Sequence, residues 1–260
     1  MGSNPSFTSP LFRLVGILFF LHYLYCEHLL LYDYGPTIGL YQGLWICSLS
    51  LLLAGLGLIL GYPKLVSTSL VAVATGHFLW TIDSIYMLYN WDIGKTIFDI
   101  GDYGGVGRQV TFATVWTNLH HIWFMPICVY YLRSIGRRLT PSDLHCSVLW
   151  ICFISAATAC VVPMECVEYD HPVHGRRCMS LNVNMIRKFW GLEGSKFMHS
   201  LDRSDGTHPV IFFIFANFMH DYVFNGFWFL VLMGFVNVGA AGGGEIKDSV
   251  RLRNTKSKMS

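Results

Sequence analysis

The chain has 260 residues, of which 53% are hydrophobic and 13% charged, with a formal net charge of +2. Soluble domains carry about a quarter charged residues, so this composition argues against a soluble globular protein. No basic stretch is combined with stacking aromatics, which argues against nucleic-acid binding. The apolar residues form long runs instead of the roughly ten-residue alternating segments of a β-barrel. Because about 20 apolar residues suffice for a helix to cross a bilayer, the sequence predicts an all-α, polytopic membrane helical bundle.

Six membrane spans are predicted in chain order, at residues 11–32, 38–61, 65–89, 109–132, 146–164 and 209–236. Glycine and proline mark the ends of the first two, in "DYGP" at 33–36 and "GYPK" at 61–64. A long polar loop, 165–207, separates the fifth span from the sixth. The spans form one transmembrane domain over residues 1–237, and a flexible basic tail follows at 238–260.

The orientation is predicted from the basic residues of the short connections, which collect on the cytoplasmic side. With six spans, one side receives Arg13, Lys64, Arg133, Arg137 and Arg138, together with the basic tail residues Lys247, Arg251, Arg253, Lys256 and Lys258. The 33–37 and 90–108 connections, which lack this basic excess, face the other side. The sequence therefore predicts a multi-pass integral membrane protein with both termini in the cytoplasm.

Histidines occupy similar depths in four of the predicted spans. His22, His77 and His220 lie near the centres of spans one, three and six, and His120 and His121 lie at the centre of span four. Asp221 follows His220, while Glu27 and Asp83 lie further toward the outer side. Ionisable groups inside a membrane are costly and usually face a bundle interior, which predicts a buried polar site. The alternative is that each ring forms an ordinary hydrogen bond between helices.

Several chemistries fit such a site. Neutral imidazoles bind transition metals, so His22, His77, His120, His121 and His220 are the candidate metal ligands. His121, His220, Asp221 and Asp83 are the candidate catalytic residues, and the two aspartates are also candidate acceptors for ligating rings. A haem held by two helices is a less favoured cofactor. No HxxxH, HxxHH or HExxH motif occurs, which argues against the common di-iron and zinc-protease sites.

Three functions remain open from the sequence. The first is a membrane-embedded enzyme, or a binding protein, that is assisted by a metal and takes a lipid-like small molecule. The second is a non-catalytic subunit or scaffold of a membrane-protein complex. The third is a proton-coupled transporter in which histidine and aspartate titrate. In each case the lipid bilayer is the expected environment.

The 165–207 loop contains Cys166, His171, His174 and Cys178, spaced as C-x4-H-x2-H-x3-C. Two thiolates and two imidazoles suit tetrahedral zinc, although the spacing matches no common zinc module. If the loop faces an oxidising compartment, a Cys166–Cys178 disulfide is the simpler interpretation. The six other cysteines lie in or beside the spans, where they are expected to pack as small apolar side chains.

Three stretches together resemble a known family. They are "HFLWTIDSIYML" at 77–88, "LHHIWFMPICVYYLRSIG" at 119–136, and "LNVN" at 181–184 with Trp190 and Gly191 after it. The chain resembles a family of uncharacterised bacterial polytopic membrane proteins that are described only as membrane-associated. The resemblance covers the middle and C-terminal two thirds of the chain and implies a fold type without a reaction. The longer, charged 165–207 loop and the doubled histidine depart from the family pattern.

Overall fold

The computed structural model describes residues 9–90, 97, 116, 119–163, 167–171, 175–179 and 222–238. Its helices are α1 (Pro10–Gly43), α2 (Ile46–Leu60), α3 (Pro63–Asn90), α5 (His120–Ser134), α6 (Pro141–Val161) and the helix Tyr222–Val238. The described residues are predominantly helical, which confirms the all-α prediction for the fold. The loop 165–207 departs from that prediction in one detail, because β1 (Val167–His171) and β2 (Gly175–Met179) pair there as an antiparallel hairpin.

Three helices of the described residues are long and apolar enough to cross a membrane. These are Pro10–Tyr32, Pro63–Asp83 and Pro141–Val161. The segments Tyr34–Gly43 and Ile46–Leu60 add a fourth if they form one span, and the helix Tyr222–Val238 is a shorter apolar helix. The length and composition of these helices are those of a membrane protein.

The outer surface of the helices is strongly apolar, as expected for contact with lipid. Leucines follow one another along the exposed side of α1, and Leu149 and Phe153 of α6 are exposed in the same way. On the helix Tyr222–Val238, Phe227 and Leu230 also point outward. Soluble monomers rarely expose apolar patches of more than a few hundred Å², so these faces are compatible with contact with the bilayer.

The predicted second span, 38–61, is not one straight helix. Its N-terminal part continues α1 beyond a kink, where Gly35 has a φ of 76° and Pro36 follows. It then bends by 64° at the break before α2. The kinked segment folds back on α1, because Gly39 lies against the backbone of Leu31 with no room for a side chain. Apolar composition alone gives no sign of such a bend.

Helices α1 and α2 cross in direct backbone contact at Gly16 and Gly55. A Cβ atom on Gly16 would lie 2.7 Å from the carbonyl oxygen of Gly55, and a Cβ on Gly55 would lie 3.0 Å from that of Gly16. Small residues allow this close approach between helices in membranes. The core between α1, α2, α3, α5 and the helix Tyr222–Val238 is then filled by large side chains such as Phe19, Leu70 and Phe124.

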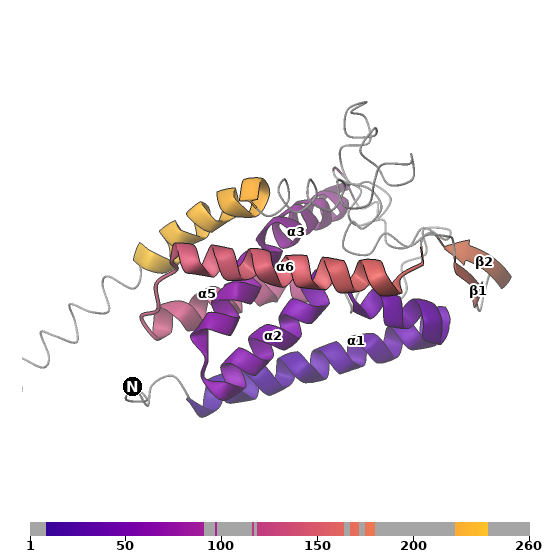
Figure 1. The fold of residues 1–260 in the computed structure, drawn as a ribbon, viewed down its shortest axis with the longest axis horizontal. Coiled ribbons are helices and arrows are strands. Elements are labelled where there is room, and N and C mark those ends of the chain that lie inside the picture. The colour runs from indigo at the N-terminus through magenta and orange to yellow at the C-terminus, as the bar shows by residue number, and fades with distance from the viewer. Residues whose placement is uncertain are drawn as a thin grey trace, which may run out of the picture.

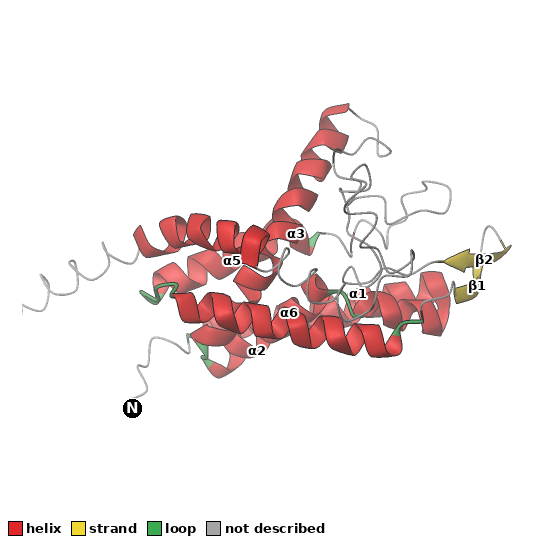
Figure 2. Ribbon diagram, turned by 45° about the horizontal axis from the view of Figure 1, so that its top comes forward, coloured by secondary structure: helices red, strands yellow, loops and turns green. Residues whose placement is uncertain are grey.

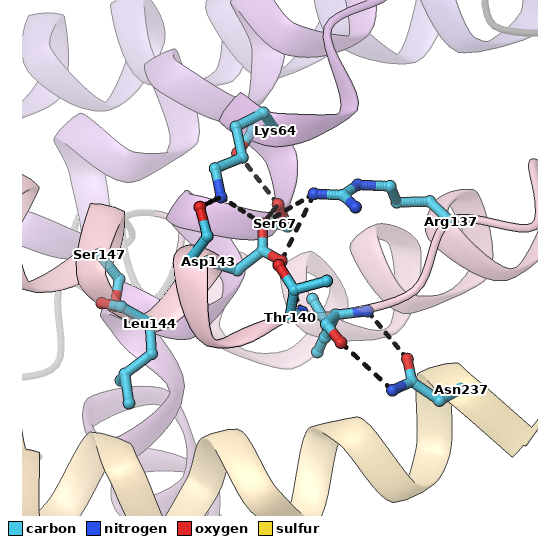
Figure 3. A network of polar contacts seen from close by, with 10 residues as sticks. Lys64, Ser67, Arg137, Thr140, Asp143, Leu144, Ser147 and Asn237 are labelled. Atoms are coloured by element: carbon cyan, nitrogen blue, oxygen red, sulfur yellow. Dashed lines mark hydrogen bonds and ion pairs between the residues drawn. The ribbon is translucent and has the colours of Figure 1, made fainter.

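One end of the bundle gathers the ends of several helices around a buried carboxylate. Asp143, in the first turn of α6, accepts hydrogen bonds from Ser67 (2.6 Å) and from the backbone and hydroxyl of Thr140 (2.7 and 2.8 Å). Lys64 and Arg137 form ion pairs with it at 3.0 and 3.1 Å. Figure 3 shows these side chains converging from α3, from the connection after α5 and from α6. Thr140 and Asp143 also form a capping box, so α6 begins at Pro141, before the predicted boundary at 146.

The first and last helices reach the same end. Asn237, near the end of the helix Tyr222–Val238, exchanges hydrogen bonds of 2.8 and 3.3 Å with the backbone of Leu139. Phe12, at the start of α1, packs edge-on against Tyr131 of α5. In Figure 1, α1 starts at the left of the molecule, and the β1–β2 hairpin lies at the right. Figure 2 shows the far end of α3 rising away from the other helices.

Candidate metal centre

Donor side chains from four helices lie at nearly the same distance from this shared end. His22 is twelve residues from the start of α1, Cys47 thirteen from the end of α2, His77 fourteen from the start of α3, and His121 thirteen from the end of α5. At a rise of 1.5 Å per residue, these positions are about 18–21 Å along their helices. The helices therefore place the four side chains at about the same level of the bundle.

Three donor side chains from two of these helices, α2 and α5, form a compact group. Cys47, His120 and His121 each offer one ligand atom, and the three atoms all lie within 4.8 Å of one another. Two donor atoms bound to one tetrahedral zinc ion lie about 3.5 Å apart, given Zn–S and Zn–N bonds of about 2.3 and 2.0–2.1 Å. A movement of about 1 Å would bring the group onto one ion, which is within the reach of side-chain adjustment.

His77 of α3 lies beside this group, although its nitrogens are not among the ligand atoms within 4.8 Å of one another. Its ring centroid lies 4.5 Å from that of His121 and 5.5 Å from that of His120, and the rings of His120 and His121 are 4.1 Å apart. His77 is 1% exposed, and neither of its ring nitrogens has a hydrogen-bond partner among the residues that the structure describes. A neutral imidazole always carries one N–H donor, and leaving such a group buried and unpaired costs about 1–3 kcal/mol. A buried group of this kind calls for an explanation, such as an ion.

Aromatic side chains enclose the three histidines. Trp80 stacks on His121 with ring centroids 4.8 Å apart, and Phe124 lies edge-on to His77 at 5.3 Å. His120 and His121 are themselves buried, with 3% and 9% exposure. The apolar walls keep the site poor in water, which strengthens every electrostatic interaction inside it.

A second donor pair lies beside the group on α1. The Nε2 atom of His22 and the Sγ atom of Cys26, one helical turn apart, are hydrogen-bonded at 3.3 Å. The His22 ring lies 5.9 Å from the ring of His120 and 5.1 Å from that of Trp123. His22 thus borders the group through His120, while its own nitrogen already has a partner in Cys26.

The structure brings together four of the five histidines that the sequence singled out as metal ligands, namely His22, His77, His120 and His121. His220 and Asp221 lie outside the described residues. Asp83 lies six residues beyond His77 on α3, where its Oδ1 accepts a hydrogen bond from the backbone N–H of Ile97 at 2.8 Å. Glu27 lies with its carboxylate directly against Gly43, at the corner between α1 and α2.

The other predicted site is only partly within the described residues. Cys178 lies on β2 opposite Glu168, and His171 ends β1 opposite Gly175. Cys166 and His174 lie outside the described residues. Both interpretations of this stretch, a disulfide and a zinc site, therefore stay predictions.

Sequence reasoning missed Cys47 and Cys26, which it assigned to packing. Cys47 does pack against the hydrophobic core, but its sulfur also lies among the histidine nitrogens. The signal that could have identified Cys47 was its position along α2, because it lies as far from the shared end of the bundle as the histidines do on their helices. Cys26 follows His22 by four residues, a spacing that puts both on one face of a helix.

The donor set defines which ions suit the group. A thiolate with imidazoles suits zinc and copper, whereas magnesium and calcium prefer oxygen ligands. Comparison with protein-family models, with curated proteins and with solved structures finds no match for this chain. The family resemblance described from the sequence thus stays a prediction, and the geometry of the group is the basis for a functional assignment.

Proposed function

We propose that this chain is a multi-pass integral membrane protein that binds a transition-metal ion, zinc or copper, inside its helix bundle. The observation that carries the proposal is the approach of Cys47, His120 and His121 from two helices, with their ligand atoms within 4.8 Å of one another. Cys47 is far from His120 and His121 in the sequence, and the fold brings its side chain to theirs. Buried ionisable side chains within membrane helices usually mark functional sites.

The unpaired nitrogens of His77 support a metal over simple helix packing. If the histidines served only to join helices, each ring would be expected to hydrogen-bond to a neighbour, as Asn225 does with Thr75 at 2.6 Å. His77 has no such partner in the ranges that the structure describes, although its ring lies against two other imidazoles. A bound cation explains why several imidazoles face one another in a dry interior, since it is attracted by all of their lone pairs.

The six-span arrangement, with both termini cytoplasmic, is part of this proposal. Its support is the common end of the bundle, where the basic connections around Lys64 and Arg137 meet at Asp143. An ion-paired cluster at this end agrees with the side that the distribution of basic residues predicts to be cytoplasmic. The donor group then lies near the middle of the bilayer, about 18–21 Å from that end.

Metal content tests the proposal directly. Protein purified in detergent and loaded with zinc should hold about one tightly bound ion per chain, and Cys47→Ser and His121→Ala should each reduce this to less than about a tenth. Elemental analysis after gel filtration measures the ratio. Matched controls are Cys160→Ser and His145→Ala, which change exposed residues of α6 and should leave the ion bound.

Two results would overturn the assignment. One is a folded wild-type protein that retains neither zinc nor copper after loading. The other is an equal loss of metal in the Cys47→Ser and Cys160→Ser variants, which would point to a non-specific thiol site. In either case the histidines would be interpreted as helix-packing groups.

A further inference from the structure

We infer that His77 supplies the fourth ligand of the metal ion, which closes the site and makes the ion a structural link between α2, α3 and α5. This inference rests on the proposed function, since it concerns the same ion. It goes further because the number of protein ligands distinguishes a structural zinc ion from a catalytic one. Three ligands leave a position for water or substrate, whereas four leave none.

The separations of the ring centroids are close to those of three imidazoles around one point, although no nitrogen of His77 is among the ligand atoms that lie within 4.8 Å of one another. A ring that binds zinc through one nitrogen has its centroid about 3.2 Å from the ion, so two such rings at a tetrahedral angle have centroids about 5 Å apart. The three separations among His77, His120 and His121 are 4.1, 4.5 and 5.5 Å, which bracket this value. The ring centroid of His22 is 5.9 Å from that of His120, and its Nε2 atom is already hydrogen-bonded to Cys26. His22 therefore lies at the margin of the group.

The bonding state of His77 favours it as the remaining donor. Both of its nitrogens are buried without a hydrogen-bond partner in the described part of the chain, so binding an ion breaks no hydrogen bond seen there. Its position on α3 also brings a third helix to the ion, beside α2 with Cys47 and α5 with His120 and His121. The resulting ligand set is one thiolate and three imidazoles, which are ligand types that tetrahedral zinc takes.

A closed site changes what the ion does. With no open position, zinc has no water to activate and instead holds three helices together at the centre of the bundle. The alternative is a catalytic site with three ligands, in which His77 acts beside the ion and a lipid-like substrate enters from the membrane. The two arrangements differ in whether His77 is bonded to the metal.

Replacing His77 by cysteine, a different metal ligand, distinguishes the closed site with four ligands from the catalytic site with three. In zinc-loaded wild-type protein, X-ray absorption at the zinc edge should show one sulfur neighbour, from Cys47. In His77→Cys the same measurement should show two, because the new thiolate takes the fourth position. Phe78→Cys, which places a thiol on the next residue of α3, is the matched control and should still show one.

One sulfur neighbour in zinc-loaded His77→Cys would overturn the inference while leaving the proposed function intact. If the zinc in the wild-type protein had no sulfur neighbour, Cys47 would not be a ligand, and the proposed metal site would be refuted. If His77→Cys does not fold, His77→Ala replaces it in a competition assay against a zinc chelator. Loss of an outer-shell partner typically weakens metal binding by about 10–100-fold, so loss of a ligand should weaken it by more than about 100-fold. An unchanged affinity would contradict the inference.

Discussion

Two buried polar residues, Asp143 and His77, differ in how their polar atoms are paired. Asp143 is fully buried, and its two oxygens are surrounded by a lysine, an arginine, two hydroxyls and a backbone N–H. Every partner is a protein group, so the carboxylate is explained by the structure itself. His77 is equally buried, and no described residue forms a hydrogen bond with its ring nitrogens. The first is therefore a structural residue, and the second is a candidate for binding something else.

Asp143→Ala should strongly destabilise the protein. The substitution removes the cap of α6 and leaves the cations of Lys64 and Arg137 without their shared partner, at an expected cost of about 3 kcal/mol in the free energy of unfolding. Denaturant titration in detergent micelles measures it. Glu168→Gln is the control, because Glu168 pairs with Arg176 on the exposed hairpin, and surface pairs contribute about 0–1 kcal/mol. Equal effects of the two substitutions would refute the structural role of Asp143.

At the scale of helices, the close crossing of α1 and α2 fixes where their donors lie. The backbone contact at Gly16 and Gly55 leaves no space for side chains. The crossing is close to the shared end of the bundle, and further along it places His22 and Cys26 of α1 near the level of Cys47 on α2. The kink at Gly35 and the 64° bend before α2 together turn the chain back, so that α2 crosses beside α1.

Gly16→Ala should separate α1 from α2. Its new Cβ would lie 2.7 Å from the carbonyl oxygen of Gly55 and 2.9 Å from Ile59, and backbone cannot yield as a flexible side chain can. Overpacking of this kind costs about 1–3 kcal/mol, measured as a lower midpoint of unfolding in detergent. Gly234→Ala is the comparison, because no atom lies within 4 Å of the Cβ it would add. It should be neutral or stabilising by about 0.5–1 kcal/mol, since alanine favours the helix. If Gly16→Ala is as stable as Gly234→Ala, the close crossing is wrong.

At the scale of the whole molecule, the arrangement of helix ends determines the predicted topology. The start of α1, the ends of α2 and α5, the starts of α3 and α6 and the end of the helix Tyr222–Val238 share one end of the bundle. The β1–β2 hairpin follows the opposite end of α6. If the chain crosses a bilayer as proposed, the Asp143 cluster and the hairpin must lie on opposite sides of it.

Labelling with a membrane-impermeant thiol reagent tests this topology. Ser142→Cys, beside the Asp143 cluster, should react only after the membrane is permeabilised, and Arg176→Cys, on the exposed hairpin, should react in intact cells. The unsubstituted chain provides the background from its own cysteines. The reverse pattern would invert the orientation, and equal reactivity of both variants in intact cells would contradict the membrane-spanning arrangement.

Much of the architecture follows from the sequence because it depends on local properties. Long apolar runs require helices in a bilayer, since no water is available there for backbone groups, and the "DYGP" stretch coincides with the kink at Gly35 and Pro36. The matched depth of the histidines was also visible, because a helix rises by a constant distance per residue. The basic connections indicated which helix ends share a side, and Lys64 and Arg137 do meet at one carboxylate.

Which side chains meet depends on how the helices pack, and this could not be read from the sequence. Depth along a helix says nothing about the direction in which a side chain points, and rotation about each helix axis is set by packing, such as the Gly16–Gly55 contact. That is why Cys47 was assigned to packing, although the structure also puts its sulfur beside the ligand nitrogens of His120 and His121. The position of each donor residue along its helix follows from the sequence, and which donors come together follows from the packing of the helices.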